Sequence, residues 1–148
     1  MLQTVHDVFE ILSLQTSRHR EFVDVTRQID AVVRASGLAE GMCLVYSPHT
    51  TAAVTVNENA DPDVVADLLN AFADLLGDEG RFRHAEGNSG GHALSSLVGP
   101  SVTLPFRQGR LHLGRWQAIY FCEFDGPRQR SLEVQLIGER AASSGATS

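Results

Sequence analysis

Two histidines, His84 and His92, stand on either side of the segment AEGNSGG. The three glycines of that segment let a short loop fold back tightly, so the two imidazoles can converge. Together with His49 from the turn SPHTT, three neutral imidazoles would match an open catalytic zinc site, in which a fourth position holds water or substrate. The spacing alone leaves an alternative, in which each histidine is an ordinary surface or core residue with a hydrogen-bond partner.

The same loop has the composition of an anion site. The run GNSGG leads into a predicted short helix that ends near Leu97, and Asn88 or Ser89 is expected to cap it. A glycine-rich helix start presents free backbone N–H groups and the positive end of the helix dipole to a phosphate or carboxylate. The run matches neither the P-loop nor the dinucleotide fingerprint, so an ordinary glycine loop remains the alternative.

Arg130 is expected to be a buried arginine. Period-two alternation places it on the apolar face of the last predicted strand, in a row with Leu132, Val134 and Leu136. A buried guanidinium group needs an anionic partner. The partner is either an internal carboxylate such as Glu123 or a bound anionic ligand.

Glu58 is a candidate general base, because it follows the strand-like run AVTV on the same side as two valines. A straight strand would place it roughly 30 Å from His49, at about 3.3 Å per residue. Either Glu58 is structural, or a neighbouring subunit brings it to the histidines.

The charge balance narrows the possible functions. The 148 residues carry 12 basic side chains, all arginine, against 18 acidic ones, for a net charge of −6. The absence of lysine excludes Schiff-base chemistry and a P-loop lysine. An acidic surface without a basic stripe argues against nucleic acid as a partner.

The predicted elements describe one α+β domain. We expect strands at both ends of the chain and helices in the middle, which favours a mostly antiparallel or mixed β-sheet sandwich with two or three helices. Residues 1–139 form this single domain, and the polar residues 140–148 form a tail that frays. The clearest helix begins at Asp61-Pro62 and ends at Gly77. Trp116 is expected in the core.

Other features indicate a cytoplasmic protein. Cys43 and Cys122 lie in apolar runs, which predicts two buried free thiols in a reducing compartment. The N-terminus lacks the pattern of a signal peptide, and no apolar stretch is long enough to span a membrane, so we expect no membrane partner.

Several motifs occur together and in a fixed order: HTTA, NE, an H…N…H loop, GxWQ and DGPRxR. With them, the chain resembles the YjbQ-like family, also called the secondary thiamine-phosphate synthase family, from about His6 to Gly138. The resemblance implies an α+β fold that assembles as a homotrimer. One departure is the pair Gly90-Gly91, where larger residues are expected in the family; it predicts a looser loop or a wider pocket.

The resemblance also implies a site. His49, His84 and His92 would surround a divalent metal, zinc or alternatively magnesium, or an anion. We assign four residues to substrate binding and Glu58 to catalysis, with the trimer bringing Glu58 to a neighbour's histidines. The substrate-binding residues are Thr50, Thr51, Asn88 and Arg130.

The activity suggested for the family is formation of thiamine phosphate from a pyrimidine diphosphate and a thiazole phosphate. Arginine, the helix start and a divalent metal suit such small phosphorylated substrates. Two other functions remain open at this point. One is a zinc-dependent hydrolase with a metal-bound water, and the other is a non-enzymatic trimer that binds a metal or a small anion.

Overall fold

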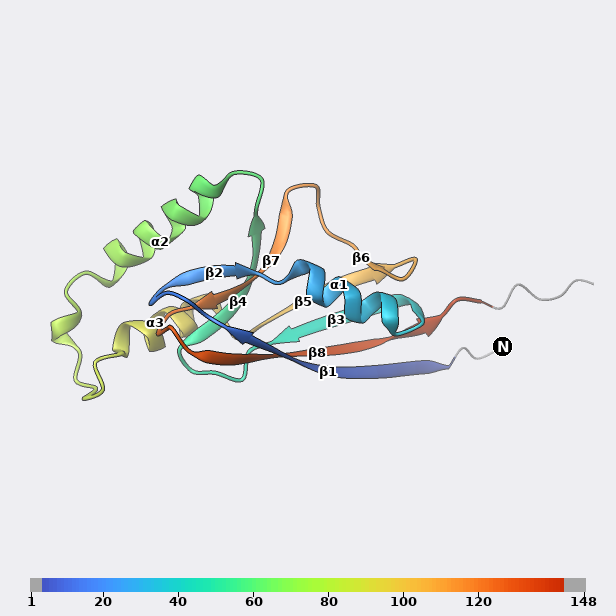
Figure 1. The fold of residues 1–148 in the computed structure, drawn as a ribbon, viewed down its shortest axis with the longest axis horizontal. Helices are drawn as coiled ribbons and strands as arrows, with labels where there is room; N and C mark the ends of the chain where they lie inside the picture. Colours follow the sequence, from blue (N-terminus) through green and yellow to red (C-terminus); the bar gives the residue numbers. More distant parts are fainter. Residues whose placement is uncertain (1–3, 143–148) are drawn as a thin grey trace, which may run out of the picture.

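The computed structural model describes residues 4–142, which form two antiparallel sheets and three α-helices (Figure 1). The first sheet has the order β1-β8-β3-β5-β6 and the second the order β2-β7-β4. The strands are β1 (Val5–Gln15), β2 (Glu21–Asp24), β3 (Leu38–Tyr46), β4 (Ala52–Glu58), β5 (Ser101–Arg107), β6 (Arg110–Leu111), β7 (Gln117–Glu123) and β8 (Gln129–Arg140). The helices are α1 (Thr26–Ala35), α2 (Pro62–Leu76) and α3 (Ser89–Val98), with a short 3-10 turn η1 (Glu79–Arg81).

The main core lies between the two sheets and α1. Alternation along β8 buries Leu132, Val134 and Leu136 completely, and β3 contributes Cys43 and Val45 to the same layer. Period-two alternation is the expected pattern for a strand with one buried face. The opposite face of α1 faces solvent, as a helix with one apolar stripe requires.

The second sheet is covered on both faces. On the face away from the first sheet, Ala53, Tyr120 and Cys122 form a smaller core with α2 and α3. The sequences of β4 and β7 contain runs of apolar residues without polar alternation, because each face of these strands packs against another layer. α3 lies against β4, so the start of α3 comes close to the residues that precede β4.

Local sequence signals explain where α2 begins and ends. The Asp61 side chain accepts a hydrogen bond from the Asp63 N–H at 2.9 Å, and Pro62 occupies the first turn. Gly77, with φ +59°, stops the helix in a conformation that favours glycine. These are the residues that the sequence predicts for this helix.

The predicted α+β architecture is confirmed, and every paired strand in residues 4–142 is antiparallel. The domain boundary differs slightly, because β8 runs through Arg140. The rest of the predicted tail lies mostly beyond the described residues. Within residues 4–142, no helix is long and apolar enough to cross a membrane.

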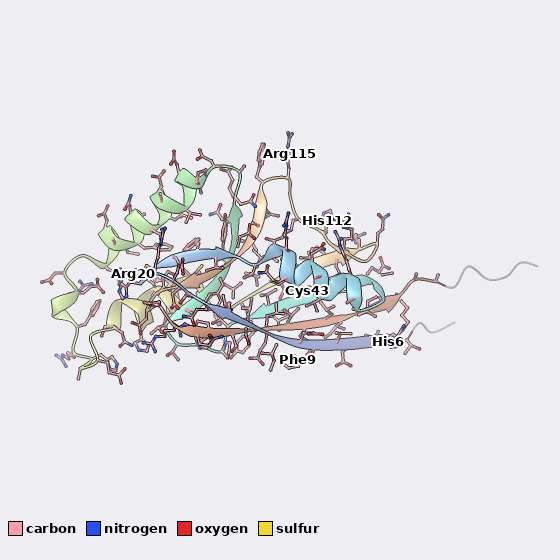
Figure 2. All side chains as sticks on the ribbon, in the orientation of Figure 1. His6, Phe9, Arg20, Cys43, His112 and Arg115 are labelled. Atoms are coloured by element: carbon pink, nitrogen blue, oxygen red, sulfur yellow. The ribbon has the colours of Figure 1, made fainter. Side chains whose placement is uncertain are left out.

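The outer face of the first sheet is open to solvent and carries many apolar side chains around Glu133 and Gln135 of β8. Register places Ile11 of β1 and Tyr46 of β3 on either side of Glu133 of β8. Three neighbouring strands thus expose large apolar side chains on one face. The exposed residues of this outer face are Val5, Phe9, Ile11, Met42, Leu44, Tyr46 and Ile137. Figure 2 shows Phe9 projecting away from the body of the domain.

Candidate functional site

His84 and His92 are brought together, as the sequence predicts. His84 lies in the loop before α3 and His92 in the first turns of α3, and their ring centroids are 5.3 Å apart with the ring planes at 89°. The His84 ring is about half exposed, and its Nε2 lies 3.6 Å from the Glu86 carboxylate. The two imidazoles are therefore neighbours with access to solvent.

The paired glycines set the position of this helix start. A Cβ on Gly91 would lie 2.9 Å from the Phe124 carbonyl oxygen, and one on Gly90 would collide with the Glu79 carboxylate. Both glycines are buried. The predicted looser loop is therefore wrong at this point, because the missing side chains let α3 pack closely against its neighbours.

Arg20 and Glu79 meet beside Gly90. The Arg20 Nη2 atom donates to the Glu79 carboxylate at 3.0 Å, and the Arg20 side chain is 18% exposed. The Arg20 Nε atom is buried without a hydrogen-bond partner among the described residues. A buried donor without an acceptor is rare in folded proteins and indicates a place for a water or a ligand.

Asn88 provides an acceptor in the same region. Its amide nitrogen donates to the Asp125 carboxylate at 3.0 Å, while its Oδ1 is buried without a partner among the described residues. Asn88 is the residue before α3, but its side chain makes no capping bond. Asn88 therefore occupies the predicted cap position without making a capping bond, and the Asp125 carboxylate orients its amide group.

Arg130 is buried, and its partner is internal. Its Nε donates to the Glu123 carboxylate at 2.9 Å, and its Nη2 donates to the Thr51 hydroxyl at 3.0 Å. Glu123 is fully buried and also accepts from the Thr16 hydroxyl at 2.7 Å. Of the two partners that the sequence allows for Arg130, the structure shows the carboxylate of Glu123.

Burial and the charge of Arg130 shift the pKa values of Glu123 and His49. Burial alone would raise the pKa of Glu123, but the hydrogen bonds from Arg130 and Thr16 hold that pKa below its usual value. Burial, and then the nearby positive charge of Arg130, lower the pKa of His49. The His49 imidazole is therefore neutral near pH 7, and its one lone pair, on Nε2, already accepts a hydrogen bond from the Ser131 N–H.

His49 lies in the turn between β3 and β4, against β8. Its Nε2 accepts a hydrogen bond from the Ser131 N–H at 3.0 Å, and Ser131 pairs with Ser13 across β8 and β1. The ring is half-buried and meets Phe121 edge-on. His49 is thus held against β8 rather than against the His84–His92 pair.

Thr51 meets Arg130 and lies beside Gly91 of α3, but Glu58 is far from the other predicted residues. Glu58 ends β4, and its backbone carbonyl accepts from the Tyr120 hydroxyl at 3.1 Å. Thr51 stands just before the other end of the same strand, roughly 20 Å away at the usual rise per residue. Thr50 is exposed in the turn. Across residues 4–142, no three His, Cys, Asp or Glu side chains are grouped so that they could hold a metal ion.

A small cavity adjoins the histidine pair. It has a volume of about 190 Å³, and His84, Ser89, Glu79 and Phe82 are among its lining residues. His84 and Ser89, the first residue of α3, line the cavity, while Arg20 and His92 contact the lining residues Glu79 and His84. Such a set can bind an anion and supply two nitrogen ligands to a metal.

Arg20 and Glu79 are site residues that sequence reasoning missed. Arg20 belongs to a turn far from α3 in the sequence and Glu79 to η1, the element before α3, and no motif joins them. The only signal in the sequence was the glycine pair, which indicates that another segment packs closely there but does not identify that segment.

The residues of the chain match known proteins over most of its length. Residues 10–139 match the family model described as "UPF0047 protein YjbQ-like". The UPF0047 protein YugU of Bacillus subtilis is 45% identical over 132 residues, which is 88% of this chain and 100% of that protein. A UPF0047 protein of Methanocaldococcus jannaschii is 44% identical over 127 residues, covering 86% of this chain and 92% of its own.

Solved structures agree with this fold. A YjbQ/UPF0047 protein of Clostridium acetobutylicum has a TM-score of 0.82 at 45% identity, over 86% of this chain and 98% of its own. A protein of unknown function from Sulfolobus solfataricus has a TM-score of 0.87 at 31% identity, over 92% of this chain and 100% of its own. By sequence and by fold, the chain belongs to the YjbQ-like UPF0047 family.

Proposed function

We propose that this protein is a metal-dependent enzyme that joins two small phosphorylated substrates, with His84 and His92 as metal ligands. The observation that carries the proposal is the distance between the two rings. Two imidazoles bound to one tetrahedral zinc have centroids roughly 5 Å apart, given Zn–N bonds of about 2 Å. The measured separation of 5.3 Å fits that arrangement. Zinc is the metal we favour, with magnesium as the alternative.

A third ligand has to come from elsewhere, because two histidines do not complete a site. We assign it to His49 and propose that a homotrimer brings His49 of one subunit to the pair of another. To bind the metal through Nε2, His49 would give up the hydrogen bond that it accepts from the Ser131 N–H. We place the contact between subunits on the outer apolar face, which β8 shares with β1 and β3. The same assembly would allow Glu58 to act as a base in a neighbouring site.

The reaction is a substitution at a pyrimidine methylene. The thiazole nitrogen supplies an electron pair for the new C–N bond, and the C–O bond to the diphosphate breaks, releasing pyrophosphate. A divalent metal held by His84 and His92 would supply positive charge for the departing pyrophosphate. The α3 N–H groups and the Arg20 Nε atom would bind phosphate oxygens. Asn88 Oδ1 would accept from a substrate donor, and Arg130 would hold Thr51 in place.

The first test is the reaction itself. Purified protein with zinc or magnesium, the pyrimidine diphosphate and the thiazole phosphate is expected to form thiamine phosphate, detected by chromatography. Arg20→Ala should lower the rate by about tenfold or more, since charge-assisted hydrogen bonds to phosphate are lost. Arg18→Ala is the matched control, because Arg18 is exposed and its side chain forms no hydrogen bond or ion pair within residues 4–142.

The outcomes separate the competing functions. Formation of thiamine phosphate only when both precursors are present supports the transferase. Phosphate or pyrophosphate release from either precursor alone would indicate a hydrolase instead. Metal binding without turnover of either precursor would leave a binding protein and contradict the proposed enzyme.

The proposed assembly makes a second prediction, which concerns the outer apolar face. Phe9→Lys and Leu44→Lys place a charge on either side of Gln135 in this face and should convert trimers to monomers, because burying a lysine that has no acidic cross-strand partner is costly. Light scattering coupled to size exclusion measures the mass. Ala71→Lys, on the exposed side of α2, is the control and should leave the mass unchanged. Monomers in the unmodified protein would contradict the trimer.

A further inference from the structure

A second cavity lies between α1 and β6, far from the histidine pair. Its volume is about 540 Å³, and a smaller hollow of about 260 Å³ continues it along α1. Figure 1 shows α1 and β6 toward the opposite end of the molecule from α3. The lining residues of the larger cavity are Thr26, Arg27, Asp30, Arg34, Arg110, Leu111 and Leu113. None of them belongs to the site described above.

Three arginines line this cavity against a single acid. Arg27, Asp30 and Arg34 are spaced three and four residues apart along α1, so they share one helix face. Arg110 comes from β6 on the other side. A local excess of positive charge is notable in a chain whose net charge is −6, because most of its surface repels anions.

Asp30 is fully occupied by contacts that build the cavity wall. Its Oδ1 accepts from the Leu111 backbone N–H at 3.0 Å, which ties α1 to β6. Its Oδ2 lies 2.8 Å from the Arg34 Nε atom and balances one guanidinium charge. The hydrogen bond from Leu111 therefore holds α1 and β6 together at the cavity wall, and Asp30 neutralises the charge of Arg34.

The other two arginines are available to a ligand. Within residues 4–142, neither Arg27 nor Arg110 forms a hydrogen bond or an ion pair through its side chain. The Asp24 carboxylate interacts electrostatically with Arg27 but is held by hydrogen bonds from Thr26 and Asn59, so it balances part of the Arg27 charge without using its N–H donors. Two guanidinium groups with free N–H donors can bind the oxygens of one phosphate monoester.

The base of the cavity is apolar. Leu111 and Leu113 are partly buried and pack against the main core. A ligand with a hydrocarbon or ring body would cover these side chains while its charged end meets the arginines. This combination of a few charged groups with apolar walls is typical of sites for small organic ligands.

We propose that the α1–β6 cavity binds a small organic phosphate monoester, with Arg27 and Arg110 on the phosphate and Leu111 and Leu113 under the organic part. The site is separate from the histidine pair, so the proposal does not depend on the proposed reaction. The ligand occupying it would act as an effector or as a second substrate-holding position, not at the metal.

Phenyl phosphate is a suitable probe, because it joins a phosphate to an apolar ring. Titration of the ¹⁵N-labelled full chain should shift the amide signals of residues 27–34 and 110–113 with saturation. Arg27→Ala and Arg110→Ala should each weaken binding by about tenfold or more. Asp30→Asn should tighten binding, since it removes the only negative charge in the wall and keeps an oxygen for Leu111. Arg18→Ala, an exposed arginine elsewhere, should change nothing.

Three results would overturn the proposal. The first is the absence of saturation up to about 10 mM phenyl phosphate, which is too weak for a built site. The second is a set of shifts confined to residues 84–92. The third is equal weakening by Arg18→Ala, which would show attraction to charge alone. Phenol and inorganic phosphate, titrated separately, should each bind more weakly than phenyl phosphate, and equal binding of inorganic phosphate would remove the role of the two leucines.

Discussion

The variants His84→Ala and His92→Ala are expected to lose bound zinc, with a fall in metal affinity of more than about 100-fold. The physical reason is that each removes one of the two imidazoles whose ring centroids lie 5.3 Å apart. Loss of residues that only support metal ligands typically lowers affinity 10- to 100-fold, so loss of a ligand should exceed that. Metal analysis of the purified, dialysed protein by mass spectrometry measures the stoichiometry.

Two other histidine variants make this test specific. His112→Ala is the matched control, because His112 is exposed and lies outside the site (Figure 2). It should keep the zinc content of the unmodified protein. His49→Ala examines the proposed third ligand and should lose zinc as well. Equal metal content in all four variants and the parent would contradict the histidine site.

A partial result would also be informative. Retention of zinc in His49→Ala, with loss in the other two variants, would keep the pair and remove His49 as the third ligand. The Glu86 carboxylate, 3.6 Å from the His84 Nε2 atom, would then be the next residue to replace. Glu86→Gln keeps its size and removes its charge.

Much of the fold was predictable, because the signals were local. The cap at Asp61, the proline after it and the glycine at position 77 fix α2 through interactions within a few residues. The buried row on β8 follows from alternation along one strand. The buried, unbridged state of Cys43 and Cys122 was predicted correctly from the apolar runs around them.

The features that were not predicted depend on distant contacts. Trp116 was expected in the core but is 52% exposed, with the Arg115 guanidinium 4.8 Å from its ring centroid. The size of the Trp116 side chain favours burial. However, Trp116 lies in the turn before β7, where no other element of residues 4–142 covers it. Similarly, the contact between Arg20 and Glu79 joins two turns that are 59 residues apart. No local pattern predicts that pairing.

The candidate site was predicted only in part. The glycine loop correctly brought His84 and His92 together, since both belong to one short segment. The third histidine belongs to another segment, and its Nε2 is held by the Ser131 N–H. A second subunit can supply the missing ligand only if the subunits pack in the right geometry. The sequence of one chain does not show which surfaces meet in an assembly.

The buried pair of Arg130 and Glu123 should contribute most strongly to stability. Glu123→Gln and Arg130→Met are each expected to lower the free energy of unfolding by about 3–5 kcal/mol, because each leaves the other partner buried without its counter-charge. Unfolding by guanidinium chloride at matched protein concentration measures the change. The double variant Arg130→Met with Glu123→Met should recover much of the loss, since no unpaired charge then remains.

The same pair predicts a pH dependence. The folded-state pKa of Glu123 is held below its unfolded value, so the stabilisation is present above that unfolded value of 4.5. It is lost as the pH falls through the lower, folded-state pKa. The difference in stability between the parent and Glu123→Gln should therefore shrink as the solution is acidified below about pH 4.5. A difference that is independent of pH would contradict the paired carboxylate.

The double variant also separates two roles for Arg130. In the structure, its guanidinium group is engaged by Glu123 and by Thr51, which makes it a positioning residue for the turn after His49. With the charge pair removed, Thr51 loses its hydrogen bond from Arg130 while the fold recovers. We expect the Michaelis constant for the phosphorylated substrates to rise with little change in zinc content. Full recovery of both stability and the Michaelis constant would show that Arg130 serves the fold alone.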